Sequence, residues 1–163
     1  MLIKLKNKGT LEFDDFKFRC CVGKNGVKQN KLEGDKSTPK GIFEIGLVYY
    51  RADRIKKPNT LVKLKIIEPN MAWCNDSKNK FYNKEIKINK LINHERLYRK
   101  DYKYDIFLVI KYNYKKTKKG LGSAIFLHLT KNYQPTAGCI ALKKKDFLIL
   151  LRLINTKTKL RIS

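Results

Sequence analysis

Five short segments rich in β-branched and aromatic residues constrain the fold more than any other feature of this chain. They are FKFRCCVG (16–23), GIFEIGLVYY (41–50), LVKLKII (61–67), YDIFLVIKYN (104–113) and SAIFLHL (123–129). Segments of this length and composition, separated by connectors rich in Gly, Asn, Pro and Lys, are typical of β-strands. The pattern predicts a mainly β fold.

One segment near the C-terminus has a different periodicity. In KKKDFLILLRLIN (143–155) the apolar residues recur at helical spacing, with Asp146 near the start and Arg152 near the end. Such charges complement a helix dipole, so we expect one amphipathic helix here. A short strand in TKLRIS (158–163) would follow it. No internal repeat or linker divides the chain, and we expect a single domain over residues 1–163.

The strong basic charge raises the question of a nucleic-acid partner. The chain has 38 Lys and Arg against 14 Asp and Glu, a formal net charge of +24. Lysine outnumbers arginine heavily, whereas recognition of phosphates and bases by paired hydrogen bonds favours arginine. The lysines are also spread over nearly every segment, together with abundant Asn and Ile, as an A+T-rich coding sequence would produce. We therefore expect no specific nucleic-acid partner, although the charge should attract carboxylate-rich substrates.

The N-terminal segment and the cysteines bear on the compartment. Charges interrupt MLIKLKNKGTLEFDDFKF where a secretory signal has its apolar core, and no run approaches the roughly 20 apolar residues of a membrane span. Cys20, Cys21, Cys74 and Cys139 form no CxxC pair, which argues against a disulfide framework and a zinc site. We expect a cytoplasmic monomer without a membrane span, metal or other cofactor.

The segment SAIFLHLTKNYQPTAGCIAL (123–142) places one of only two histidines close to a cysteine. A catalytic cysteine needs a base, a site for the oxyanion and access to substrate. His128 at the end of a predicted strand could be the base. Gly138 allows a tight turn that presents backbone N–H groups beside Cys139. From the spacing alone, a buried core cysteine and a locally satisfied histidine remain the commoner alternative.

Two motifs resemble a known family. HLTKNYQPTAGCIAL, together with the upstream GDKSTPKGIFEI, resembles the L,D-transpeptidase catalytic-domain (YkuD-type) family. Its TPxGxF turn and strand is matched by Thr38, Pro39, Gly41 and Phe43. WCND, FYN and HERLYR are similar to a compact branch that has little beyond the catalytic domain. The resemblance runs from about Phe18 to the helix after the cysteine.

The resemblance implies a β-sandwich-like catalytic domain and acyl transfer on peptidoglycan stem peptides or muropeptides. Cys139 would attack the carbonyl before a terminal D-alanine and form a thioester, with His128 as general base and acid. Backbone N–H groups around Gly138 and Cys139 would form the oxyanion hole, and Thr136 fills the hydroxyl position of the motif. An amine would resolve the thioester by L,D-transpeptidation, or water by L,D-carboxypeptidation. The cytoplasmic expectation favours water, whereas the family's usual setting is the periplasm or cell envelope.

The sequence also departs from the family pattern and leaves a second interpretation open. Many members have a histidine before the Gly-Cys pair and an arginine or asparagine after it, where this chain has Ala137 and Ala141. His94 or Arg96 could bind a substrate carboxylate, and His94 could equally be a structural residue. The alternative function is a basic binding module for nucleic acid or cell wall with an inactive site.

Overall fold

The computed structural model describes residues 1–163 and consists of β-strands with one helix, as predicted. The strands are β1 (Leu2–Lys6), β2 (Thr10–Phe13), β3 (Phe16–Cys21), β4 (Val27–Lys28), β5 (Thr38–Pro39), β6 (Gly41–Tyr50), β7 (Leu64–Ile66), β8 (Met71–Cys74), β9 (Glu85–Lys87), β10 (His94–Arg96), β11 (Ile106–Ile110), β12 (Phe126–Leu129), β13 (Ile140–Leu142) and β14 (Lys159–Ile162), and the helix is α1 (Lys144–Leu153).

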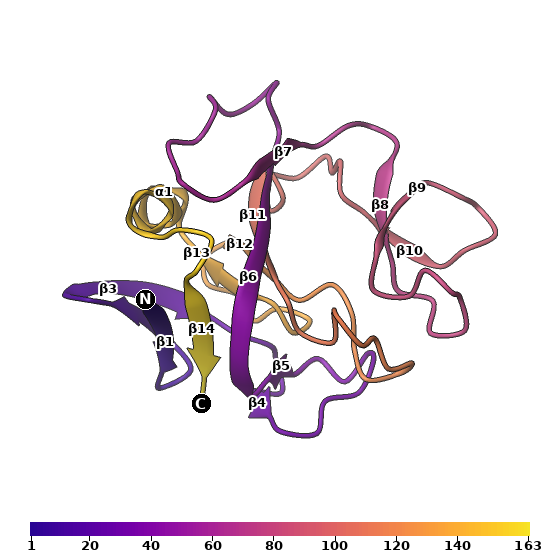
Figure 1. Ribbon diagram of the computed structural model, residues 1–163, viewed down its shortest axis with the longest axis horizontal. Helices are drawn as coiled ribbons and strands as arrows, with labels where there is room; N and C mark the ends of the chain where they lie inside the picture. Colours follow the sequence, from indigo (N-terminus) through magenta and orange to yellow (C-terminus); the bar gives the residue numbers. More distant parts are fainter.

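Nine strands form the main sheet, in the order β11-β12-β13-β3-β2-β1-β14-β6-β7. The long strand β6 closes it, because the first part of β6 pairs with β14 and the part from Ile45 to Tyr50 pairs with β11. β8, β9 and β10 form a separate small sheet on one side of β6 and β11, and α1, β1 and β3 lie on the other side (Figure 1). The mainly β prediction is confirmed.

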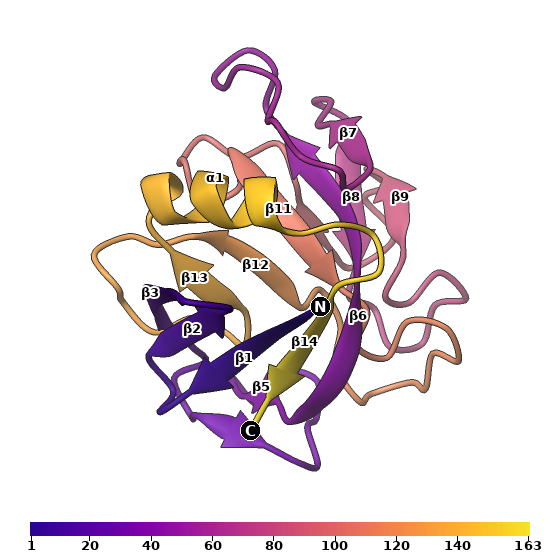
Figure 2. The ribbon, with the colours of Figure 1, turned by 60° about the vertical axis from the view of Figure 1, so that its left-hand side comes forward.

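Two hydrophobic clusters occupy the two faces of the β11-β12-β13 segment. The larger one, of 26 buried residues, fills the space between the strands and α1, which packs against β12 (Figure 2). The smaller one, of 11 buried residues, lies between these strands and β8. Leu127 and Leu129 of β12 belong to the larger cluster and Phe126 to the smaller one, as expected from the alternation of side chains along a strand. His128 therefore lies on the face of the smaller cluster.

The helix follows its predicted pattern closely. Phe147, Leu150 and Leu151 are buried at helical spacing, Asp146 lies in the first turn and Arg152 in the last. With ten residues the helix is too short to cross a membrane.

The main differences from the prediction concern short strands. The sequence pattern does not predict the N-terminal hairpin β1–β2 or the small sheet that contains β8. β12 and β13 run parallel. Residues 130–139 lead the chain back to the end of the sheet where β12 begins, so that β13 enters beside β12 in the same direction.

Candidate active site

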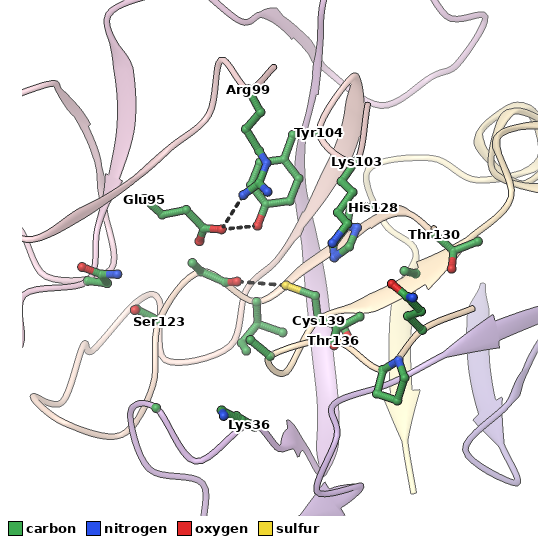
Figure 3. A pocket seen from close by; sticks show the side chains of 18 of the residues that line it. Lys36, Glu95, Arg99, Lys103, Tyr104, Ser123, His128, Thr130, Thr136 and Cys139 are labelled. Atoms are coloured by element: carbon green, nitrogen blue, oxygen red, sulfur yellow. Dashed lines mark hydrogen bonds and ion pairs between the residues drawn. The ribbon is translucent and has the colours of Figure 1, made fainter. Parts of the chain in front are cut away.

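A cavity of about 550 Å³ opens on the face of β12 and β13 that carries the smaller cluster. The cavity, called the pocket below, is lined by His128, Thr136 and Cys139 from the predicted motif and by His94 from the small sheet. Figure 3 shows the side chains of Cys139 and His128 in this pocket. The structure thus brings the two proposed reactive residues together from β12 and the residue before β13.

The alternation of side chains along a strand explains why the side chains of His128 and Cys139 both enter the pocket. His128 is the register partner of Ala141 in the parallel β12–β13 pair, and Cys139 precedes Ala141 by two residues. Side chains two residues apart point to the same face of a strand. The intervening Ile140 is fully buried in the larger cluster, which fixes this register.

The turn before the cysteine depends on Gly138 and Thr136. Gly138 has a φ of 140°, and a Cβ at this position would lie 2.8 Å from the backbone oxygen of Ser37. Thr136 Oγ1 accepts a hydrogen bond from the N–H of Gly138 at 3.0 Å and donates one to the carbonyl of Cys139 at 2.6 Å. The threonine hydroxyl therefore holds the turn from both sides.

The same hydrogen bonds decide which amide can bind an oxyanion. The Gly138 N–H is engaged by Thr136, whereas the backbone N–H of Cys139 donates to no protein acceptor. Of the two amides expected to form the oxyanion hole, the one available in this structure is that of Cys139. The backbone N–H of the exposed Ala137 also donates to no protein acceptor.

His128 has a defined tautomer. Its Nδ1 lies 2.9 Å from the carbonyl oxygen of Leu129. Since a carbonyl oxygen only accepts hydrogen bonds, Nδ1 carries the proton in the neutral ring and Nε2 carries the lone pair. Burial lowers the pKa of His128 to about 4, and the positive charges of Lys103 and Arg99 oppose protonation further. The ring is a neutral base with Nε2 free.

Cys139 is a neutral thiol in this structure. Its Sγ donates to the carbonyl of Ala124 at 3.2 Å and accepts from the N–H of Phe126 at 3.3 Å. Burial raises the pKa of Cys139 to about 12, and the charge of Glu95 raises it as well. No hydrogen bond joins the thiol to His128. The resting pair is therefore not a thiolate–imidazolium pair, and the proton must move after substrate binds.

Sequence reasoning missed a polar group beside the thiol. The Tyr104 hydroxyl donates to Glu95 Oε1 at 2.6 Å, and Arg99 Nη1 lies 3.8 Å from the same oxygen (Figure 3). All three residues line the pocket. Burial raises the pKa of Glu95 and, well above its usual range, that of Tyr104. The segment HERLYR was singled out in the sequence, but for other residues.

The residues chosen from HERLYR lie differently. His94 lines the pocket, with Nδ1 hydrogen-bonded to the carbonyl of Ile92 at 2.6 Å. Arg96 is exposed and lies outside the pocket lining. No signal in one sequence distinguishes Glu95 and Arg99 from their neighbours, because the placement of β10 and of the loop that follows it determines which side chains reach the pocket. The chain has no group of three His, Cys, Asp or Glu side chains arranged to hold a metal ion.

Comparison with known proteins agrees with the motif. A family model described as the L,D-transpeptidase catalytic domain (YkuD) matches residues 3–162, nearly the whole chain. No curated protein matches the chain.

Proposed function

The chain belongs to the L,D-transpeptidase catalytic-domain family, and from this premise we propose that Cys139 and His128 carry out acyl transfer on peptidoglycan stem peptides. The family acts on peptidoglycan peptides. The observation that carries the assignment is the arrangement of β12 and β13. Their register puts a thiol and a free imidazole Nε2 on one face, in one pocket, beside an unengaged amide N–H.

In the first step the thiol proton moves to His128 Nε2 while Sγ attacks the carbonyl carbon of the L,D bond. The carbonyl oxygen becomes an oxyanion, which the N–H of Cys139 would stabilise. The charge of this oxyanion is absent from the bound substrate and develops on the way to the tetrahedral intermediate, so a free amide N–H contributes to rate more than to substrate binding. Thr136 holds the turn that aims this N–H.

The tetrahedral intermediate then collapses. The C–N bond breaks, and the proton on Nε2 passes to the nitrogen of the leaving D-alanine, so His128 acts as base and then as acid. The product is a thioester between Cys139 and the tripeptide. An amine or water then gives up a proton to Nε2 and attacks the thioester, and the proton returns to sulfur as the S–C bond breaks.

We propose that water is the main acceptor, which makes L,D-carboxypeptidation the principal reaction. The support for water is the predicted cytoplasmic location, and Ala137 and Ala141, which line the pocket, are compatible with it. The predicted cytoplasmic location stays a prediction, and a fusion to a reporter that works only after export tests it.

The proposed function is tested with a purified stem tetrapeptide, with and without an excess of an acceptor amine. We expect tripeptide and D-alanine as the main products, identified by mass, and no turnover by Cys139→Ser. Crosslinked product as the main species would overturn the choice of water, and turnover by Cys139→Ser would overturn the assignment of the nucleophile.

A further inference from the structure

Lys103 is a half-buried cation that lines the pocket without an acidic partner. The acidic residues on either side of it are engaged. Asp101 Oδ2 pairs with Arg99 at 2.6 Å, and Asp105 Oδ1 pairs with Arg54 at 2.9 Å. Asp101 does accept the backbone N–H of Lys103, at 3.0 Å, but Lys103 Nζ forms no ion pair. The ammonium group is therefore free to bind an anion.

The loop that carries Lys103 is held firmly against β12. Leu129, the residue after His128, donates its backbone N–H to the carbonyl of Lys103 at 3.0 Å. Two arginines bind the preceding backbone: Arg51 Nη1 reaches the carbonyl of Arg99 at 2.9 Å, and Arg54 reaches those of Lys100 and Asp101 at 3.1 Å. Lys103 is thus fixed in position next to the histidine rather than carried on a loose segment.

Lys103 and His128 lie next to each other in the pocket (Figure 3). The Tyr104 ring packs against the His128 ring in a T-shaped arrangement, with the two ring centroids 5.3 Å apart. The charged groups that act on the imidazole are Lys103 and Arg99, which oppose its protonation, and Asp101, which favours it. Arg99 is already paired with Asp101. Lys103 is the uncompensated positive charge beside the base.

The chemistry of the leaving group indicates which anion comes close to Lys103. The leaving D-amino acid receives the proton from Nε2 on its nitrogen, so that nitrogen must lie at His128. Its carboxylate is separated from the nitrogen by a single carbon. A free C-terminal carboxylate is therefore brought within a few ångströms of the imidazole. Of the pocket's lysines without an ion pair, which are Lys36, Lys103 and Lys131, Lys103 is the one whose charge acts on His128.

We propose that Lys103 binds the terminal carboxylate of the leaving D-amino acid, which makes the site selective for a free C-terminus and couples substrate binding to activation of His128. The coupling follows from charge compensation, because a carboxylate on Lys103 removes the repulsion that opposes the imidazolium form. The inference rests on the proposed function and assigns to Lys103 the carboxylate-binding role that sequence analysis had considered for His94 and Arg96.

The first test needs no substrate. His128 is titrated by NMR in the wild type, in Lys103→Met and in Lys100→Met, with His94→Gln used to assign the two histidines. Lys100 is a matched control, because it is exposed on the same loop and outside the pocket lining. We expect Lys103→Met to raise the pKa of His128 and Lys100→Met to leave it near the wild-type value. An unchanged pKa in Lys103→Met would overturn the coupling.

The second test compares a tetrapeptide that ends in free D-alanine with the same peptide as the C-terminal amide. A charge-assisted hydrogen bond contributes roughly 10- to 100-fold, so Lys103→Met should lower the ratio of kcat/KM for the free acid to kcat/KM for the amide by about that factor. Lys103→Arg, which keeps the charge, should retain most of the preference for the free acid. A preference that survives in Lys103→Met would refute the role of Lys103. Absence of turnover of both peptides by the wild type would instead refute the proposed function.

Discussion

Cys139 should be an unreactive thiol in the absence of substrate, which is unusual for a catalytic cysteine. Burial raises its pKa to about 12, Glu95 opposes the thiolate further, and His128 is not hydrogen-bonded to it. The pKa of an unperturbed cysteine is about 8.5, so the thiolate fraction at pH 7 falls by roughly three and a half orders of magnitude. The greater nucleophilicity of a thiolate with a higher pKa restores about one and a half orders. We expect alkylation by iodoacetamide about 100-fold slower than that of a free cysteine.

The assay follows alkylation of the peptide that contains Cys139 by mass spectrometry between pH 6 and 10. The rate should rise with pH throughout, without a plateau near neutrality. Glu95→Gln removes the negative charge beside the thiol and should accelerate the reaction. Alkylation at pH 7 as fast as that of free cysteine, with a plateau below pH 8, would show that the resting state is a thiolate and refute the reasoning.

Three further predictions concern the residues around the thiol. Gly138→Ala should destabilise the protein by about 1–3 kcal/mol and remove most activity, because it combines a disfavoured φ with a clash against the Ser37 backbone. The destabilisation is measured in a thermal melt. Gly120→Ala is the matched control, because Gly120 has a positive φ but open space around the new Cβ. Thr136→Val should lower kcat, because it removes the hydroxyl that holds the turn and orients the Cys139 N–H, whereas Thr136→Ser should retain most of the wild-type kcat. Equal kcat values for the two variants would show that the hydroxyl has no role in catalysis. His128→Ala should lower kcat/KM at least about 100-fold. In the wild type, kcat/KM should decrease on the acid side only as the pH approaches the pKa of His128, about 4, because the imidazole is a neutral base above that pH.

The sequence predicted the reactive pair from the family motif, since the spacing alone left a buried core cysteine and a locally satisfied histidine as the commoner alternative. Alternation in SAIFLHL then separates the leucines on either side of His128, which pack in the larger cluster, from the histidine, which points to the other face. β8 could not be predicted in this way. All four residues of MAWC are buried, and the Pro and Asn residues around this short segment do not mark it as a strand.

The polar surroundings of the pair could not be predicted in the same way. Arg99 and Lys103 lie on the loop that follows β10, and Glu95 lies on β10 itself. Arg51 and Arg54, which are 46 to 48 residues away along the chain, bind the backbone of this loop. Long-range contacts of this kind leave no periodic signal in one sequence. The neutral resting state of Cys139 and His128 could not be predicted from the sequence either, because it follows from how deeply the two side chains are buried.

The most direct test of the account is to trap the acyl-enzyme. The protein is mixed with a stem tetrapeptide, quenched in acid on a millisecond-to-second timescale, and mapped by peptide mass spectrometry. The account predicts a thioester of the tripeptide on Cys139, formed together with one equivalent of D-alanine and absent in Cys139→Ser. Release of D-alanine without any adduct on Cys139, or an adduct on another residue, would contradict it.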